Sequence, residues 1–457
     1  MIATPLADVR QIVGGRPAEL SARTVSRVTV DTRDVQPGDL FVAIVGERFD
    51  PHAMLGQIAH AAAAVVSRVP DDAPPDLPLI VVADTRRALG ELGNHHRRSL
   101  AKTKVIAVAG SNGKTGTKRL IHAALSGSLK GSASPKSFNN DLGVPLTLLP
   151  VEPGDDYVIV EVGTNHPGEV ARLSEIAEPD IGVITSIGEE HLEGLRDLDG
   201  VRAENASLLT GMRPDGLLVV NGDDAGLVAR CNAYGGKKLR FGIGPRNNLF
   251  ARRVETGFDG TRFDLNGGRA RVELPLIGEH NATNALAAVA VARRLGVPDD
   301  VMLAGLAACE PPPMRMQPIH AGGVRLLHDA YNANPHSMRA ALRTLAALPH
   351  DGRRVAILGD MLELGDASAD YHREIGRLVE ELKIDRLITI GPAAATLAAA
   401  SVRAGLPSAE AWCFATSCEA AECVRNLIGH GDLVLLKGSR GVRLERYADA
   451  AVAAFGG

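Results

Sequence analysis

The sequence predicts an α/β protein with three domains, at residues 1–101, 102–316 and 317–457. At 457 residues, the chain has room for about three domains of ordinary size. Short apolar runs alternate with helical stretches over the second and third parts, and this alternation is typical of parallel sheets that are covered by helices on both faces. The segment Glu310-Pro-Pro-Pro313 separates those two parts and is predicted to be a rigid linker.

The first 101 residues are predicted to form an α/β domain. Strand-like pieces flank a turn at Pro37-Gly38 between Thr29 and Ile44. A helix is predicted from Thr85 to Ala101, and it leads into the second domain.

The second and third domains are each predicted to contain a parallel sheet. In the second domain the predicted elements are strands at 105–109, 157–162, 181–186 and 217–220, short β pieces between Thr261 and Leu276, and an amphipathic helix from Asn281 to Arg294. In the third domain the predicted strands are 324–328, 354–358, 386–390, 411–414 and 433–436. This third pattern resembles a dinucleotide-binding fold, but it lacks the sequence G-x-G-x-x-G, so NAD binding has little support.

Composition and charge exclude several classes of protein. Lysine and arginine number 50 against 54 aspartates and glutamates, and only 3% of residues are aromatic, so neither a basic surface nor stacking platforms for nucleic acid are expected. No apolar run of about 20 residues predicts a membrane span, and the first residues do not indicate a signal peptide. The cysteines show no C-x-x-C pairing and are expected to be reduced thiols in a cytoplasmic protein; they are Cys231, Cys309, Cys413, Cys418 and Cys423.

The most informative stretch runs from Val105 to Thr115. Five apolar residues, 105–109, predict a buried strand that leads directly into Gly110-Ser-Asn-Gly-Lys-Thr115, and a helix is predicted to follow. A strand, a glycine turn and a helix N-terminus form a cradle for phosphate, because backbone N–H groups can approach the anion and the helix dipole adds positive charge. Lys114 is expected to reach the β- and γ-phosphates of a nucleotide, and the Thr115 hydroxyl is expected to bind Mg²⁺.

This phosphate loop, residues 110–115, departs from the spacing G-x4-G-K-T, because Val108 stands five residues before Gly113. The plainer alternative is an ordinary turn between a strand and a helix. Such a turn does not need Lys-Thr directly after the second glycine, so we predict a nucleotide site.

Two further polar side chains follow predicted strands of the same sheet. Glu161 ends one apolar run, and His191 follows another by a short loop. Because ligands of parallel sheets bind beyond the carboxyl ends of the strands, both residues are expected to converge with the phosphate loop on one crevice. A carboxylate and an imidazole beside a triphosphate predict a Mg²⁺ site. Burying the carboxylate without a partner would be costly, whereas a lone loop histidine is often a surface residue or a helix cap.

Several longer motifs, taken with the phosphate loop, resemble those of the Mur ligase family, the ATP-dependent amide-forming enzymes of peptidoglycan precursor synthesis. They are SFNNDLGVPLT (137–147), GEHNATNA (278–285), HDAYNANPHSM (328–338), LGDMLELG (358–365), KGSR (437–440) and DTRDVQPGDLF (31–41). The block from Asp329 to Met338 is similar to the signature D-S-Y-N-A-N-P-x-S-M of the family members that add D-alanyl-D-alanine. The resemblance runs through all three predicted domains.

The resemblance implies a central ATP-binding domain between an N-terminal α/β domain for a UDP-bearing substrate and a C-terminal Rossmann-like ligase domain. It implies catalytic roles for Lys114, Glu161 and His191. It also implies that Thr115 binds a first Mg²⁺ and that Glu161 and His191 hold or position a second. The implied ATP-binding residues are Gly110, Ser111, Asn112, Gly113, Lys114, Thr115, Asn281, Arg315 and Asp329. The implied substrate-binding residues are Thr32, Arg33, Asn139, Asn140, Tyr331, Asn332 and Asn334.

Plainer explanations exist for four of these residues. Asn139 and Asn140 suit a turn without any ligand. Arg315 suits a solvated surface, and Asp329 suits a helix N-cap. Only the motifs around these residues favour the functional roles.

One departure from the family pattern concerns a second metal. The resemblance implies a lysine at position 205, whose carbamate would lie beside that metal, but the residue is Asn205 and no lysine occurs between Lys136 and Lys237. An amide cannot form a carbamate. Either Asn205 directs a water molecule, or Glu204 adapts, or the second metal site is weaker.

The implied reaction joins D-alanyl-D-alanine to UDP-N-acetylmuramoyl-tripeptide. The terminal carboxylate of the tripeptide would take the γ-phosphoryl group of ATP to give an acyl phosphate and ADP, and the amine of the dipeptide would then displace phosphate. The expected partners are therefore these small molecules, with ATP and Mg²⁺ as cofactors and no nucleic acid, and the chain is expected to act as a monomer. Two alternatives stay open: a sibling ligase that adds a single amino acid, including the folylpolyglutamate type, and a homologue that binds nucleotide without catalysis.

Overall fold

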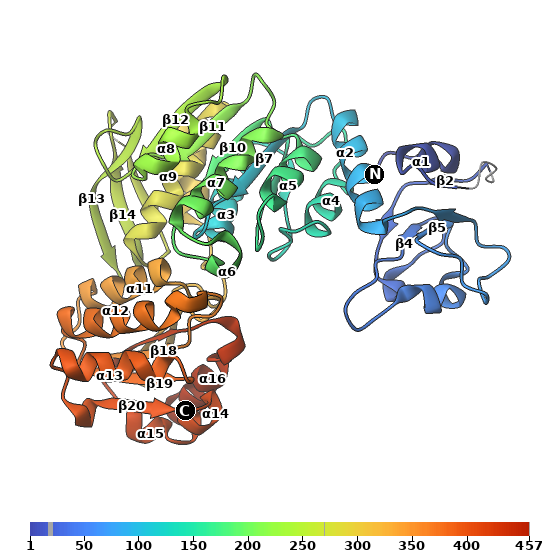
Figure 1. Cartoon of the computed structure of the whole chain (residues 1–457). Helices are drawn as coiled ribbons and strands as arrows, with labels where there is room; N and C mark the ends of the chain where they lie inside the picture. The colour runs from blue at the N-terminus through green and yellow to red at the C-terminus, as the bar shows by residue number, and fades with distance from the viewer. Residues whose placement is uncertain (17–21, 269, 457) are drawn as a thin grey trace.

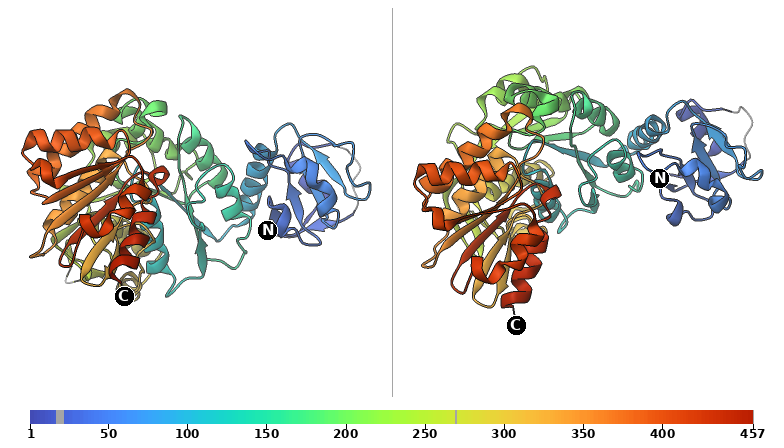
Figure 2. Two further views of the ribbon diagram at one scale, coloured as in Figure 1. Left: turned by 90° about the horizontal axis from the view of Figure 1, so that it is seen from below. Right: turned by 60° about the horizontal axis from the view of Figure 1, so that its bottom comes forward.

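The computed structural model describes residues 1–16, 22–268 and 270–456. These residues form an N-terminal, a central and a C-terminal lobe, each built around its own large sheet (Figure 1). In both further views the central and C-terminal lobes face each other, while the N-terminal lobe stands to one side (Figure 2). Within the described ranges, no helix combines the length and the apolar character that crossing a membrane requires.

The N-terminal lobe contains a parallel sheet in the order β3-β4-β5-β6. Its strands are Val28–Thr29, Leu40–Val42, Ala63–Val66 and Leu79–Val81. A short antiparallel pair, β1 (Thr4–Pro5) with β2 (Thr24–Val25), lies beside α1 (Leu6–Ile12). The lobe also contains two 3₁₀ helices, the single turn η1 (Thr32–Asp34) and the longer η2 (Pro51–Ile58). The predicted turn at Pro37-Gly38 joins β3 to β4.

Helix α2 (Thr85–Ser99) belongs to both the N-terminal and the central lobe. Its Leu89 and Leu92 lie in the N-terminal core, and Leu149 of the central lobe completes that core. Arg97, only 1% exposed, donates from Nη2 to Asp180 Oδ2 at 2.7 Å and from Nε to a neighbouring carbonyl of the central lobe. The domain boundary that the sequence predicts after residue 101 therefore stays a prediction, because the helix before it packs against both lobes.

The central sheet has the strand order β15-β14-β13-β12-β11-β10-β7-β9-β8. It is parallel from β8 to β13 and antiparallel over β13, β14 and β15, so the parallel sheet predicted from the sequence carries an antiparallel edge. The strands are β7 (Lys104–Ala109), β8 (Gly131–Ala133), β9 (Tyr157–Glu161), β10 (Ile181–Ile184), β11 (Leu217–Asn221), β12 (Lys237–Gly242), β13 (Leu249–Gly257), β14 (Gly260–Leu265) and β15 (Arg271–Leu274).

Helices cover both faces of this sheet because alternate side chains of each strand point to opposite faces. In β7, Ile106 and Val108 join the apolar cluster under α3 and α9, whereas Val105 and Ala107 join the cluster on the other face. The helices are α3 (Lys114–Leu125), α4 (Gly143–Leu148), α5 (Glu169–Ala177), α6 (Leu192–Leu195), α7 (Leu198–Ala206), η3 (Ser207–Thr210), α8 (Ala225–Cys231), α9 (Glu279–Arg294) and α10 (Asp299–Ala307).

The C-terminal lobe is a sheet in the order β16-β17-β21-β18-β19-β20, parallel except for β16. Its strands are β16 (Gln317–Ala321), β17 (Val324–His328), β18 (Arg354–Gly359), β19 (Arg386–Ile390), β20 (Ala411–Phe414) and β21 (Leu433–Lys437). Its helices are α11 (Pro335–Ala347), η4 (Gly365–Ala367), α12 (Ser368–Glu381), α13 (Ala394–Ala404), η5 (Ser408–Glu410), α14 (Ser417–Glu422), α15 (Val424–Leu427), η6 (Arg440–Val442) and α16 (Glu445–Phe455). Every strand predicted for this lobe is present; β16 was not predicted.

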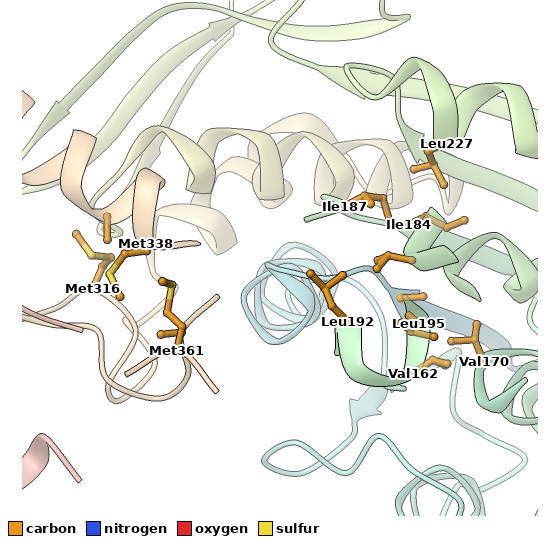
Figure 3. Close-up of a cluster of buried hydrophobic side chains, with 14 of the residues drawn as sticks. Val162, Val170, Ile184, Ile187, Leu192, Leu195, Leu227, Met316, Met338 and Met361 are labelled. Atoms are coloured by element: carbon orange, nitrogen blue, oxygen red, sulfur yellow. The ribbon is translucent and has the colours of Figure 1, made fainter. Parts of the chain in front are cut away.

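One apolar cluster contains buried side chains of both the central and the C-terminal lobe. Figure 3 shows part of it, with Ile187 and Leu192 from the central lobe and Met316, Met338 and Met361 from the C-terminal side. The carboxyl ends of the central strands therefore face α11 and the loops of the C-terminal lobe.

Candidate active site

The phosphate loop connects β7 to α3 in the conformation that its glycines permit. Gly110 has φ 132° and Gly113 has φ 83°, a region that favours glycine. A Cβ on Gly110 would lie 2.0 Å from Thr185 Oγ1, and one on Gly113 would lie 2.5 Å from Asn284 Oδ1. A larger residue at Gly110 would collide with the segment after β10, and one at Gly113 would collide with α9. The two glycines therefore let the loop pass close to both elements, beside the cavity described below.

Lys114, the first residue of α3, lies over the loop that precedes it. Its Nζ donates to the carbonyl oxygens of Gly110 at 2.5 Å and Ser111 at 3.2 Å. Glu190 Oε2 lies 3.9 Å from the same ammonium group. The side chain is therefore held at the helix N-terminus, where a phosphate group would bind.

Glu161, at the end of β9, is buried and does have a partner. Its Oε2 lies 2.9 Å from Nζ of Lys118, and the two residues are 1% and 3% exposed. Lys118 Nζ also donates to the carbonyl oxygens of Ser134 at 2.9 Å and Lys136 at 2.5 Å. Sequence reasoning identified the cost of burying Glu161 but missed Lys118, which stands one helical turn after Lys114 on the buried side of α3.

Thr115 and Asn139 meet the same carboxylate. Thr115 Oγ1 donates to Glu161 Oε2 at 3.0 Å, and Asn139 Nδ2 donates to Oε1 at 3.3 Å. A hydroxyl and a carboxylate are oxygen donors of the kind that Mg²⁺ prefers, so these residues fit that ion. Among the described residues, no three histidine, cysteine or acidic side chains form a ready-made metal cage.

His191 lies where β10 leads into α6, with φ 49°. Its Nδ1 is 2.5 Å from Oε2 of Glu363, which belongs to the C-terminal lobe. That contact directs the other ring nitrogen, Nε2, toward Glu190, whose Oε2 is 4.0 Å away. A carboxylate on one nitrogen of an imidazole orients the second nitrogen for a ligand.

The C-terminal lobe provides the opposite side of the site. Arg315 donates from Nη2 to Thr115 Oγ1 at 3.2 Å, and its guanidinium lies 4.2 Å from the centre of the Tyr331 ring. Asp329 Oδ2 accepts from Lys437 Nζ at 2.7 Å, and the same ammonium donates to the Asn332 carbonyl at 3.1 Å. Asp329 is thus paired with a lysine rather than capping a helix.

Two further hydrogen bonds and an ion-pair network join the lobes around the site. Asn334 caps α11 through Ser337 N and donates from Nδ2 to Asn112 Oδ1 at 3.0 Å. The Tyr331 and Ser137 hydroxyl oxygens are 2.7 Å apart. On α11, Arg339 Nη1 lies 3.1 Å from Oε2 of Glu189 in the central lobe, and Arg339 Nε lies 2.7 Å from Oε1 of Glu374 in its own lobe. Hydrogen bonds to Glu374 and Glu189 raise the pKa of Arg339, although burial opposes them.

Two half-buried histidines near this interface, His336 and His280, stay neutral more readily than exposed ones. His336 of α11 packs against Gly188, where an added Cβ would lie 2.5 Å from His336 Cβ. Burial lowers the pKa of His336 below the ordinary value for histidine, and burial likewise lowers that of His280 at the start of α9.

A cavity of about 1010 Å³ brings most of the expected residues together. Those that line it are Ser111, Asn112, Gly113, Lys114, Thr115, Asn139, Asn140, Glu161, His191, Asn281, Arg315, Asp329, Tyr331, Asn332 and Asn334. Asn281 donates to the Ile277 carbonyl at 3.0 Å, and Asn140 Oδ1 accepts from Gly143 N at 2.9 Å, so Asn140 also shapes the turn before α4.

Thr32 and Arg33 lie elsewhere. They form η1 of the N-terminal lobe, and the Arg33 side chain is 86% exposed and paired with Asp31. From the N-terminal side, the cavity is instead lined by Glu47 and Arg86. Asn205 is absent from the cavity lining and donates to the Val201 carbonyl at 3.0 Å in its own helix.

Comparisons with known proteins agree with this architecture. The model of the Mur ligase middle domain matches residues 108–292, and that of the Mur ligase glutamate ligase domain matches residues 314–440. A UDP-N-acetylmuramoyl-tripeptide–D-alanyl-D-alanine ligase of Bacillus subtilis is 33% identical over 450 residues, 97% of each chain.

Solved structures give the same result. A crystal structure of MurF from Acinetobacter baumannii superposes with a TM-score of 0.89 at 33% identity and covers 98% of this chain and 99% of its own. MurF of Thermotoga maritima in complex with ADP, at 24% identity, shares the fold with a TM-score of 0.83 over 94% of this chain and 97% of its own. On the strength of these matches along nearly its whole length, the chain belongs to the Mur ligase family and, within it, to the MurF group.

Proposed function

We propose that this chain is an ADP-forming ligase that joins D-alanyl-D-alanine to the terminal carboxyl group of UDP-N-acetylmuramoyl-tripeptide, a step of peptidoglycan precursor synthesis. The observation that carries the proposal is the cavity in which Lys114 and Glu161 of the central lobe face Arg315 and Asp329 of the C-terminal lobe. The near full-length similarity to the Bacillus subtilis ligase supports the choice of substrates.

ATP is needed because a carboxylate is a poor acceptor for an amine. Transfer of the γ-phosphoryl group converts the carboxylate to an acyl phosphate, and the dipeptide amine then attacks the acyl carbon and releases phosphate. Lys114 and the N-terminal N–H groups of α3 offset the repulsion between the carboxylate and the triphosphate. Arg315, which already reaches Thr115 from the other lobe, adds positive charge at the same place.

Thr115, Glu161 and His191 would hold Mg²⁺, which supplies charge neutralisation at the phosphates when it is bound. Asn281 and Asp329 would bind the nucleotide beyond the phosphates. Lys118 keeps the Glu161 carboxylate in one orientation through the ion pair at 2.9 Å.

The substrates would occupy the rest of the cavity and its mouth. Asn139, Asn140, Tyr331, Asn332 and Asn334 line the cavity near the phosphate loop and are proposed to contact the peptide ends. Thr32 and Arg33 are proposed to meet the uridine end of the long substrate, since they lie outside the cavity on the N-terminal lobe.

Two properties of the chain suit this chemistry. Closure of the facing lobes around bound substrates would exclude water, which would otherwise hydrolyse an acyl phosphate. All five cysteines lie in the described part of the chain and are free, as in a reducing compartment. We therefore propose a cytoplasmic enzyme that acts as a monomer.

The test removes the Lys114 ammonium group. Lys114→Ala should keep the unfolding temperature close to that of the unsubstituted protein, yet slow ADP release in the presence of both substrates by about 10²–10³-fold or more, the usual cost of losing one such stabilising group. Lys130→Ala is the matched control, because Lys130 is exposed and, among the residues that the structure describes, forms ion pairs only with Glu152 and Asp155.

Three outcomes decide between the candidates. Normal turnover of Lys114→Ala would remove the phosphate-loop assignment. ADP release that depends on a single amino acid instead of the dipeptide would identify a sibling ligase. Binding of ATP without substrate-dependent ADP release by the unsubstituted protein would identify a non-catalytic homologue.

A further inference from the structure

Glu190 is a buried carboxylate that the mechanism above does not use. It is 7% exposed, it stands directly before His191, and it lines the cavity beside the phosphate loop. Its Oε1 is shielded from solvent and has no hydrogen-bond partner among the described residues. Its Oε2 is 3.9 Å from Lys114 Nζ and 4.0 Å from His191 Nε2.

The preceding residue shows how differently a carboxylate is treated when its role is structural. Glu189 accepts three hydrogen bonds from the guanidinium of Arg339, two at 3.2 Å and one at 3.1 Å. Burying a carboxylate oxygen with no partner costs free energy on the order of 1–3 kcal/mol or more. Because buried charges in proteins are paired or coordinate metal ions, an oxygen in this state beside a phosphate-binding loop is a candidate cation ligand.

We propose that Glu190 is a ligand of a divalent cation that it shares with His191, next to the phosphate loop. The proposal rests on the proposed function, because this cation is the Mg²⁺ that His191 would hold there, and Glu190 would bind it together with His191 and a nucleotide phosphate. Two protein ligands are sufficient, since Mg²⁺ completes its shell with water and phosphate oxygens.

The geometry on the protein side suits such a pair. Octahedral ligands at about 2.0–2.1 Å from Mg²⁺ are separated by roughly 3 Å when adjacent and roughly 4 Å when opposite. The observed 4.0 Å between Glu190 Oε2 and His191 Nε2 lies within this span. The Glu363 carboxylate holds Nδ1 of His191, so Nε2 is the nitrogen that is free for the ion.

Neither Asn205 nor Glu204, the two residues that the sequence offers in place of the family's lysine, lines the cavity. Asn205 is neutral, 1% exposed and bonded to the Val201 carbonyl. The Glu204 oxygens accept from the backbone N–H groups of Gly168 at 2.7 Å and Val170 at 2.8 Å, at the start of α5. Glu190 therefore supplies the anionic charge that neither of these side chains can supply to the cavity.

The test is a titration of Mn²⁺ into the full-length protein with ADP, followed by electron paramagnetic resonance of free Mn²⁺. Glu190→Gln preserves shape but removes the charge, and it should weaken Mn²⁺ binding by about tenfold or more, since even indirect partners of a metal ligand contribute 10–100-fold. Glu190→Asp, which keeps a carboxylate, should retain more affinity than Glu190→Gln. Glu193→Gln, an exposed residue of the same segment outside the cavity lining, should leave the affinity unchanged.

ADP binding in EDTA separates the possible roles of the residue. If Glu190 acts through the metal, Glu190→Gln should bind ADP without metal as well as the unsubstituted protein does, with an unfolding temperature no lower. Equal Mn²⁺ affinity in Glu190→Gln and the unsubstituted protein would overturn the inference alone. A loss of ADP affinity in EDTA that is as large as the loss with Mn²⁺ would also overturn it and assign Glu190 to Lys114. If the unsubstituted protein binds no ADP, the proposed function fails, and this inference fails with it.

Discussion

Replacing Lys118 by methionine should strongly destabilise the central lobe. Lys118 is 3% exposed, and its Nζ contacts Glu161, the Ser134 carbonyl and the Lys136 carbonyl. Methionine keeps most of the apolar stem and removes the positive charge. Glu161, 1% exposed, would keep only Thr115 and Asn139 as hydrogen-bond donors to its carboxylate.

The magnitude follows from the burial of the pair. Removing one partner of a buried ion pair costs about 3–5 kcal/mol, because the other charge stays buried without compensation. For a domain of roughly 150–250 residues, each 1 kcal/mol lowers the unfolding temperature by about 2–4 °C. Lys118→Met should therefore lower it by roughly 6–20 °C.

Differential scanning calorimetry of the full-length protein measures the effect. Lys130→Met is the matched control: Lys130 is 63% exposed, and an exposed ion pair contributes about 0–1 kcal/mol. The double variant Lys118→Met/Glu161→Gln should regain much of the lost stability, because it removes the uncompensated charge. If the unfolding temperature of Lys118→Met lay within about 2 °C of that of the control, the pair of Lys118 with Glu161 would not be a stabilising buried ion pair. So would a double variant less stable than the single one.

Two further predictions concern the contacts between lobes and the pH dependence of stability. Arg339→Met should loosen the contact with Glu189, increase the radius of gyration in small-angle X-ray scattering and slow turnover. The control is Arg343→Met, because Arg343 is exposed and lies one turn further along α11. Unchanged scattering and turnover in Arg339→Met would contradict a role of Arg339 in holding the lobes together. Burial lowers the pKa of His96, whose Nε2 is 2.8 Å from the Val151 carbonyl oxygen, so below an unfolded value of about 6.5 the unfolded chain takes up the proton first. As the pH falls below that value, His96 should lower the free energy of unfolding by at most about 1.4 kcal/mol per pH unit. In urea unfolding experiments between about pH 6.5 and 5, the free energy of unfolding should therefore depend less on pH in His96→Gln than in the control His95→Gln, which changes an exposed histidine. The same pH dependence in both variants would refute this role of His96.

Much of the fold and of the site could be predicted because the signals are local. The apolar runs of β7, β9 and β10 are continuous, as expected for strands buried on both faces. Since parallel strands end at one edge, the positions of Lys114, Glu161 and His191 at strand ends were enough to predict their convergence.

The remaining features depend on contacts between distant segments. Nothing in the helical pattern of α3 shows that Lys118 is buried, because its partner stands at the end of a strand that follows later in the chain. Glu363 and Arg339 reach the central lobe only once the two lobes are packed together. The position of Arg33 outside the cavity depends on how α2 sets the N-terminal lobe beside the central one, which no local pattern encodes.

The shared position of α2 affects how the chain is made. Protein synthesis delivers β3 to β6 first, but the apolar core around Leu89 and Leu92 is completed by Leu149, which leaves the ribosome much later. The core of the first lobe is therefore complete only after Leu149 has been synthesised, although N-terminal domains commonly fold before the rest of a chain. For the same reason, removing the residues before α2 would expose Leu89 and Leu92 to solvent. A soluble fragment of the central and C-terminal lobes would therefore need polar residues at these positions.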